Sequence, residues 1–157
     1  MKEIEGKWIS FTAWGHENIK ALHKTTLELT RESHLTPRGD CIIGVRSELA
    51  VGDLPGWFKA QARDPEALIV LVLCSARERI CDSIVGSGHP GLSFEDRIRI
   101  IVRKSTYIDG KTLMIKASKS ARDLRRDLVQ ALARGDRLDA YLTVIKEPME
   151  GFPGRTS

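Results

Sequence analysis

Short runs of hydrophobic residues, separated by polar and glycine-rich stretches, predict the same series of elements twice along this chain. The first half predicts three strands, a helix and a strand, near 7–14, 20–31, 40–47, 53–63 and 67–75. The second half predicts the same order, near 80–87, 96–105, 112–118, 120–134 and 138–146. A repeated order of this kind indicates two similar units within one chain.

The second helix has the clearer local signals. Leu124, Leu128 and Leu132 recur at helical spacing. Ser120 is placed to cap the start of the helix, and Gly135 stands where a left-handed residue commonly ends one. The first helix is predicted with poorer signals, because glycine and proline crowd its start and a proline follows its end.

Alignment of the chain with itself at an offset of 73 residues places Gly15-His16 over Gly88-His89. At the same offset "KTTLELTR" (24–31) lies over "RIRIIVRK" (97–104), and "ALIVLVL" (67–73) over "AYLTVIK" (140–146). Few positions are identical, but the hydrophobic pattern agrees in order and without a gap. The alignment therefore predicts an internal duplication.

These observations predict an α+β fold, a single domain (1–157) built from two tandem repeats at about 7–75 and 80–147. Each repeat is strand-strand-strand-helix-strand. The strands form either a mostly antiparallel sheet or a closed barrel, with two helices packed on it. Neither half has enough apolar surface to fold well alone, so we expect the halves to interleave. The tail (148–157), rich in proline and glycine, is predicted to be mobile.

Composition places the chain among ordinary globular proteins, with 41% hydrophobic and 29% charged residues. No apolar run approaches membrane-spanning length, and no export signal is visible at the start, so we expect no membrane partner. Cys41, Cys74 and Cys81 are odd in number and include no CxxC pair, which argues against a disulfide framework and a zinc site. Cys41 and Cys74 are expected to act as small core residues, and a cytoplasmic location follows.

The net charge of +4 permits an anionic partner such as RNA or a phosphorylated metabolite. Arginine outnumbers lysine 15 to 10, which is compatible with the ion-paired surface of a thermophilic protein.

Two stretches, "FTAWGHENIKALHKTTLELT" and "LTPRGDCIIGV", resemble an uncharacterised conserved archaeal family, domain-of-unknown-function family 371. The resemblance covers most of the chain and is densest between Phe11 and Val45. It implies an archaeal cytosolic origin and a small α+β fold. It implies no activity, cofactor or catalytic residue.

Histidines supply the first candidate site. His16 and His89 follow strands at matching positions of the two halves, so their loops could converge in one cleft and hold a ligand. The alternative is that Gly-His is only a turn element of the repeat. His23 shares strand parity with Leu27 and should face inward, with Asp96 as its counterpart; a buried histidine with satisfied hydrogen bonds is the alternative. His34 is expected on the surface.

Arg38 and Asp40, in "TPRGD", could present a guanidinium and a carboxylate at the edge of such a cleft, or simply form a turn. Arg97, Arg99 and Arg103 are expected on one face of a strand. Such a face could follow an RNA backbone, but no aromatic residue accompanies it, so an ion-paired surface is the alternative.

The sequence therefore predicts a protein that binds a small anionic ligand, a phosphorylated metabolite or a nucleotide, in a cleft between its repeats. The binding residues would be His16, His23, Arg38, Asp40 and His89. An RNA-binding module using the arginine strand is the alternative. No catalytic residue, metal site or cofactor is identified, enzymatic activity stays open, and a homodimer is compatible with the sequence.

Overall fold

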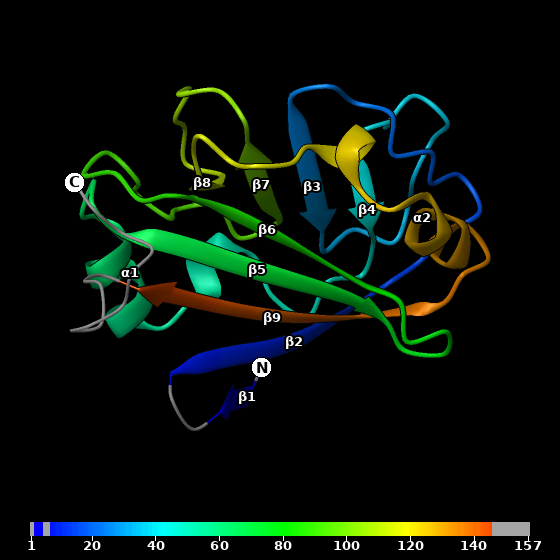
Figure 1. Ribbon diagram of the computed structural model, residues 1–157, viewed down its shortest axis with the longest axis horizontal. Coiled ribbons are helices and arrows are strands. Elements are labelled where there is room, and N and C mark those ends of the chain that lie inside the picture. The colour runs from blue at the N-terminus through cyan, green and yellow to red at the C-terminus, as the bar shows by residue number, and fades with distance from the viewer. Residues whose placement is uncertain (1, 5–6, 146–157) are drawn as a thin grey trace.

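The computed structural model describes residues 2–4 and 7–145, which form an α+β fold of two sheets and two helices (Figure 1). The larger sheet is antiparallel throughout. Its strands, in spatial order, are β1 (Lys2–Ile4), β2 (Trp8–Trp14), β9 (Arg137–Ile145), β5 (Leu68–Ser75) and β6 (Cys81–Ser87). The predicted tail, 148–157, lies outside the described residues.

The smaller sheet is mixed. Its strands, in spatial order, are β4 (Ile42–Gly44), β3 (Thr26–Thr30), β7 (Arg99–Arg103) and β8 (Thr112–Met114). The central β3–β7 pair is antiparallel, whereas β3–β4 and β7–β8 are parallel. Single bridges, Trp14 to Val45 and Ser87 to Ile115, join the two sheets at their corners. The closed barrel allowed by the sequence is therefore wrong, because the ladders stop at these corners.

Strands from the two halves of the chain alternate in the larger sheet. The last strand, β9, lies between β2 and β5 and pairs with both along most of its length (Figure 1). Strand β5 in turn separates β9 from β6. The two halves therefore interleave as expected: from β2 to β6, each strand lies beside strands of the other half. The short strand β1 is the exception, since it pairs with β2 of the same half.

Each predicted helix is in fact a 3-10 turn followed by a shorter α-helix. The elements are η1 (Val51–Asp53), α1 (Gly56–Ala62), η2 (Ala121–Asp123) and α2 (Arg126–Ala133). Leu54 and Leu124 adopt extended backbone angles between turn and helix, which divides the segments predicted at 53–63 and 120–134. Ser120 caps the turn η2, through Asp123, and not the α-helix.

The predicted strands 20–31 and 96–105 are shorter than expected, at Thr26–Thr30 and Arg99–Arg103. Ala21 has a left-handed φ of 51°, which is incompatible with a continuous strand. Ahead of β7, the Asp96 carboxylate accepts from the amides of Ile98 (2.8 Å) and Arg99 (2.6 Å), so a turn occupies the start of the strand predicted at 96–105. The strands predicted at 40–47 and 112–118 likewise shrink to three residues each, because Arg46 and Lys116 turn the chain with φ near 50°.

One hydrophobic core fills the space between the two sheets. It includes Phe11, Leu71 and Leu142 from the larger sheet and Leu29 and Ile100 from the smaller one. Alternate residues of β5, β6 and β9 face this core, and the remaining residues face outward. Among the described residues no helix is long and apolar enough to cross a membrane.

Candidate functional site

The first Gly-His dipeptide binds the end of helix α2. The amide of Gly15 donates to the carbonyl of Asp136 (2.7 Å), and that of His16 donates to the carbonyl of Leu132 (2.9 Å). A Cβ atom on Gly15 would lie 2.0 Å from the Leu132 oxygen, so only glycine fits. The dipeptide therefore caps a helix that belongs to the other half of the chain.

The second Gly-His dipeptide does the same for helix α1. The amides of Gly88 and His89 donate to the carbonyls of Ala67 and Ala62, each at 3.0 Å. A Cβ atom on Gly88 would lie 2.1 Å from the Ala62 oxygen. The repeated Gly-His element thus has a structural cause, namely close approach to the last helical carbonyl.

Neither imidazole faces the other. His16 Nδ1 accepts from the amide of Asn18 (3.0 Å) and His89 Nδ1 accepts from the amide of Gly91 (2.9 Å), so each ring closes its own turn. The helices that the two dipeptides cap lie at opposite ends of the long axis (Figure 1). The structure therefore does not bring His16 and His89 into one cleft.

His23 and Asp96 have equivalent roles but do not form a pair. His23 Nδ1 accepts from the amide of Thr26 (3.1 Å), and an Asp96 carboxylate oxygen accepts from the amide of Arg99 (2.6 Å). Each residue thus begins one of the two central strands, β3 and β7, which run antiparallel. Because antiparallel strands begin at opposite ends, the two side chains lie apart.

Arg38 and Asp40 lie in a turn. The amide of Gly39 donates to the carbonyl of Thr36 (3.1 Å), and the carbonyl of Asp40 accepts from the amide of His23 (3.2 Å). The turn therefore lies beside the start of β3, and the Arg38 side chain is exposed. Of the five predicted ligand-binding residues, the structure brings together His23 and the Arg38–Asp40 turn, but not His16 or His89.

The predicted arginine strand is ion-paired at every position. Arg97 contacts Asp53 (3.0 Å), Arg99 contacts Glu28 (3.3 Å) and Glu32, and Arg103 contacts Asp109 (2.9 Å). Arg97 precedes β7, whose first residue is Arg99. These pairings match the ion-paired surface that the sequence left as the alternative.

Glu28 and Cys41 form a half-buried polar contact beside this strand. The Cys41 Sγ atom donates to Glu28 Oε1 at 3.8 Å, and Glu28 also contacts Arg99. Burial raises the pKa of Glu28, although Arg99 opposes the effect. Burial, with help from the Glu28 and Asp40 charges, raises the pKa of Cys41 to about 11. The thiol of Cys41 is therefore protonated at neutral pH and unsuited to act as a nucleophile.

Alkylation should reveal this raised pKa. At pH 8 a thiol of pKa about 11 is ionised in about one molecule in a thousand, against about one in ten for the ordinary value of 9.0. Cys41 should therefore react with iodoacetamide about a hundredfold more slowly than N-acetylcysteine, and its rate should still rise above pH 9. Mass spectrometry of the labelled chain measures this. Glu28→Gln should accelerate the reaction, whereas a rate equal to that of N-acetylcysteine would contradict the assignment.

A cavity of about 470 Å³ lies where helix α2 ends against the β5–β6 turn. Residues from both halves line it, and we call it the arginine cavity: Trp14, Ala76, Arg77, Glu78, Ala131, Arg134, Gly135, Asp136 and Arg137. Asp136 holds its walls together, because its carboxylate accepts from the backbone amides of Arg77 (3.1 Å) and Arg137 (2.9 Å). These hydrogen bonds from backbone amides to one carboxylate hold the β5–β6 turn and the start of β9 in place around the cavity.

Two of the three arginines that line the arginine cavity form ion pairs, and the third does not form one with the described residues. Arg134 contacts Glu78 (3.1 Å) and Arg137 contacts Asp139 (2.9 Å). The Arg77 guanidinium has no ion pair or hydrogen bond with any of the described residues. Trp14 adds a partly exposed ring, over which the Arg46 guanidinium stacks at 4.9 Å. The arrangement offers a free cation beside a flat aromatic surface.

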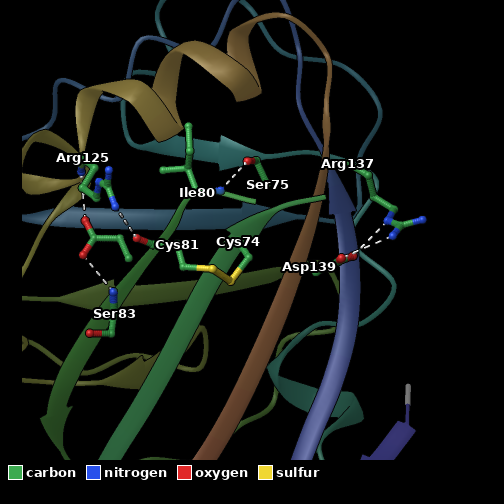
Figure 2. Close-up of a disulfide and its surroundings, with 9 residues drawn as sticks. Cys74, Ser75, Ile80, Cys81, Ser83, Arg125, Arg137 and Asp139 are labelled. Atoms are coloured by element: carbon green, nitrogen blue, oxygen red, sulfur yellow. Dashed lines mark hydrogen bonds and ion pairs between the residues drawn. A yellow bond between two sulfur atoms is a disulfide. The ribbon is translucent and has the colours of Figure 1, made fainter. Parts of the chain in front are cut away.

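A second cavity, of about 370 Å³, opens on the outer face of the larger sheet beside the first. We call it the disulfide cavity, lined by Cys74, Ser75, Ala76, Arg79, Cys81, Arg137, Asp139 and Tyr141. Cys74 and Cys81 face each other across β5 and β6 and are joined by a disulfide (Figure 2). The prediction that no disulfide is present and that Cys74 is a core residue is wrong, because Cys74 lies on the outward face of β5.

The sequence contained a weak signal for both cavities. The Arg-rich segments at residues 77–79 and 134–137 each follow a strongly predicted element, a strand in one case and a helix in the other. Their proximity depends on the insertion of β9 beside β5, which places Arg137 next to the β5–β6 turn. That insertion has no local signature in the sequence.

The described residues contain no cluster of three or more histidine, cysteine, aspartate or glutamate side chains that could hold a metal ion.

A family model described as "Domain of unknown function (DUF371)" matches residues 11–145, a span that contains both helices and every residue lining the two cavities. An uncharacterized protein of the archaeon Methanocaldococcus jannaschii is 43% identical over 126 residues, which are 80% of this chain and 91% of that protein.

Proposed function

We propose a ligand-binding function for this chain, which belongs to the family described as Domain of unknown function (DUF371), as its sequence had indicated. The ligand is a small anion that carries a flat group, such as a nucleotide, and the site is the arginine cavity. The observation that carries the proposal is the Arg77 guanidinium, which has no partner among the described residues, at the wall of a cavity of about 470 Å³.

Charge favours an anion there. Arg77, Arg134 and Arg137 line the cavity against the two carboxylates of Glu78 and Asp136. Guanidinium groups bind phosphate and carboxylate through paired hydrogen bonds, so a ligand could engage Arg77 without breaking an existing ion pair. A cavity with surplus positive charge and one unpaired arginine is therefore suited to a phosphate group.

The end of helix α2 does not oppose this charge. The last carbonyls of a helix carry partial negative charge, which would repel an anion if they were free. Here the Leu132 carbonyl accepts from the amides of His16 (2.9 Å) and Gly135 (3.0 Å). Capping by the Gly-His dipeptide thus satisfies a carbonyl at the helix end beside the cavity, which links the repeated dipeptide indirectly to the proposed site.

Trp14 favours a ligand with an aromatic or other flat portion. The residue is 36% exposed and forms part of the wall. Stacking of a base on an aromatic side chain contributes about 1–3 kcal/mol. A nucleoside phosphate should therefore bind more tightly than inorganic phosphate.

We also infer an origin by duplication. Two pairs of non-glycine residues with left-handed backbone support it: Ala21 with Phe94, both at φ 51°, and Arg46 with Lys116, at 49° and 52°. The first pair is 73 residues apart and the second 70, so the halves correspond only with a three-residue deletion between β7 and β8. The arginine cavity would then be a site built from parts of both copies.

Calorimetric titration with adenosine monophosphate and inorganic phosphate tests the binding proposal. We expect Arg77→Gln to weaken binding of both probes about tenfold, since about 1.4 kcal/mol of charge interaction is lost. Trp14→Ala should weaken binding of adenosine monophosphate but not of phosphate. The Arg77 guanidinium has no partner among the described residues to lose, and its amide keeps the contact with Asp136, so the fold of the variant should be unaffected.

Arg122→Gln is the matched control, because Arg122 is exposed and lies outside the cavity. Arg38→Gln tests the site predicted from sequence in the same titration. Binding lost with Arg38→Gln but not with Arg77→Gln would transfer the site to the Arg38–Asp40 turn. Absence of heat with both probes at millimolar concentration would refute the proposal.

RNA binding by Arg97, Arg99 and Arg103 is the weaker alternative, because carboxylates already pair with all three guanidiniums. It requires an affinity that falls steeply with salt, by roughly 0.7 log units per log unit of salt for each phosphate contacted. No retardation of single-stranded RNA at low salt would exclude it.

A further inference from the structure

The Cys74–Cys81 disulfide adds little to the fold that the strands do not already provide. It joins residues seven apart that face each other in the β5–β6 hairpin. Seven residue pairs, from Leu68–Ser87 to Cys74–Cys81, already hold these strands in register. Because a disulfide stabilises mainly by closing a loop in the unfolded chain, so short a loop yields a small effect.

The disulfide is also accessible. Cys81 is exposed and Cys74 is half-buried, and both line the disulfide cavity of about 370 Å³. A thiol small enough to enter this cavity can therefore reach a sulfur atom without unfolding of the hairpin. Disulfides that are purely structural are more often shielded from such attack.

Arginine side chains lie around the two sulfurs, although Arg125 also forms an ion pair with Asp127 at 2.7 Å. Arg79 and Arg137 line the cavity. The Arg79 amide donates to the carbonyl of Ser75 (2.9 Å), but its guanidinium has no ion-pair or hydrogen-bond partner among the described residues. On the other side of the hairpin, Arg125 donates to the carbonyl of Cys81 at 3.4 Å (Figure 2). Asp139 is the one carboxylate of the cavity, and Arg137 pairs with it at 2.9 Å.

Such surroundings have two chemical effects. Nearby guanidiniums lower the free energy of a thiolate, so a cysteine of this pair leaves more readily when the disulfide is attacked. They also attract a thiol that carries a negative charge elsewhere in the molecule. Tyr141 supplies a flat wall against which such a molecule can pack.

We propose that the Cys74–Cys81 disulfide is a thiol–disulfide exchange site for small thiols that carry a carboxylate or phosphate group. The thiolate of the small molecule attacks Sγ of the exposed Cys81. A sulfur–sulfur bond forms between them, the Cys74–Cys81 bond breaks, and Cys74 leaves as a thiolate that takes a proton from water.

A second molecule of the same thiol completes the reaction. Its thiolate attacks the small-molecule sulfur of the mixed disulfide and releases Cys81 as a thiolate, which is then protonated. Two thiols are oxidised to one small disulfide, and the protein disulfide is reduced to two cysteines. Electrons and protons balance without another reactant.

This inference goes beyond the proposed anion binding and does not rest on it. The two cavities share only Ala76 and Arg137. Arg77 and Arg134 line only the arginine cavity, whereas Arg79 lines only the disulfide cavity. Variants at these positions therefore separate the failure of one proposal from the failure of the other.

Reduction of the oxidised full-length chain by three thiols tests the proposal. The thiols are mercaptoacetate, 2-mercaptoethanol and cysteamine, which carry negative, zero and positive charge beside the sulfur. Samples are quenched in acid and alkylated, and the appearance of labelled Cys74 and Cys81 is followed by mass spectrometry. Rate constants are compared per thiolate, so that differences in thiol pKa do not enter.

We expect mercaptoacetate to react about tenfold faster than 2-mercaptoethanol, and cysteamine more slowly than either, at low ionic strength. Arg79→Gln should remove most of this preference, and 1 M salt should do the same. Arg122→Gln, the matched control, should keep it, because Arg122 is exposed and lines neither cavity.

Three results would overturn the proposal. The first is a chain that, when purified in air, lacks the 2 Da mass difference expected for one disulfide. The second is equal reactivity of the three thiols per thiolate. The third is a preference for mercaptoacetate that Arg79→Gln leaves intact.

Discussion

Replacement of either Gly15 or Gly88 by alanine is expected to destabilise the protein by about 3 kcal/mol. The added Cβ atom would lie 2.0 Å from the Leu132 oxygen in the first case and 2.1 Å from the Ala62 oxygen in the second. Both oxygens belong to backbone at the ends of helices, so no side-chain rotation relieves the contact. The strand end or the helix end must move.

That movement would also break hydrogen bonds. In Gly15→Ala the amides of Gly15 and His16 would lose the carbonyls of Asp136 and Leu132. Each bond contributes about 1 kcal/mol, and buried groups left unpaired cost more. Overpacking and lost hydrogen bonds therefore act in the same direction, as they also do in Gly88→Ala.

Urea unfolding followed by circular dichroism measures the effect. Gly56→Ala is the matched control, because a Cβ atom there meets no atom within 4 Å and the residue opens helix α1. The control should be neutral or more stable by up to about 1 kcal/mol, since alanine favours helix. A midpoint for Gly15→Ala or Gly88→Ala equal to that of the control would contradict the role assigned to these glycines.

Asp82→Ala is expected to destabilise the protein by about 2–3 kcal/mol at neutral pH. Asp82 lies in β6, is 8% exposed, and forms an ion pair with Lys119. Its carboxylate also accepts from the amides of Ser83 (2.8 Å) and Arg125 (2.9 Å), the latter just before helix α2 begins. Alanine would leave a lysine and two amides without their acceptor.

The loss should depend on pH. Burial acts to raise the pKa of Asp82, but hydrogen bonds from Lys119, Arg125 and Ser83 outweigh it, so the pKa is lower than the ordinary 3.8. A lowered pKa in the folded state stabilises the protein above pH 3.8, and this contribution disappears as the pH falls through the folded-state pKa. The difference in stability between wild type and Asp82→Ala should therefore shrink in strong acid.

Asp127→Ala provides the comparison, because Asp127 is exposed and its partner Arg125 is exposed as well. Exposed ion pairs contribute about 0–1 kcal/mol, so this variant should remain close to wild type. Thermal unfolding across a pH series measures all three chains. A stability difference for Asp82→Ala that stays constant from pH 7 to below the folded-state pKa would contradict the ionic role of Asp82.

Local patterning predicted the elements but not their neighbours. Strand β5 and the leucines of helix α2 were recognisable, because burial on one face leaves a periodic signal. The division of the first helix had a local signal, since Pro55 favours extended backbone angles at Leu54, the residue before it. Leu124 has no proline after it, so its extended conformation comes from tertiary packing.

The Cys74–Cys81 disulfide could have been predicted from the positions of the two cysteines. An odd cysteine count suggested free thiols, yet Cys74 and Cys81 flank a short connection between two predicted strands. Residues so placed face each other in a hairpin. The cytoplasmic location was predicted partly from the assumption of free cysteines, so that support falls away and the location stays a prediction.

The sequence indicated some residues and motifs of the candidate site, but not which of them lie close together. The repeated Gly-His dipeptides marked equivalent places, but not that His16 and His89 would serve their neighbouring helices. The weak signal of the Arg-rich segment 77–79 did not single out Arg77. What distinguishes Arg77 is the absence of a partner for its guanidinium among the described residues and the approach of β9. Both properties arise from contacts distant in sequence.

The location of β9 between β2 and β5 also bears on how the protein is made. While the ribosome is still adding residues 137–145, β2 and β5 have no shared neighbour and both expose hydrogen-bonding edges. The larger sheet can therefore close only after β9 has left the exit tunnel. A nascent chain stalled before β9 would still expose the edges of β2 and β5 to chaperones, and the addition of β9 covers both edges.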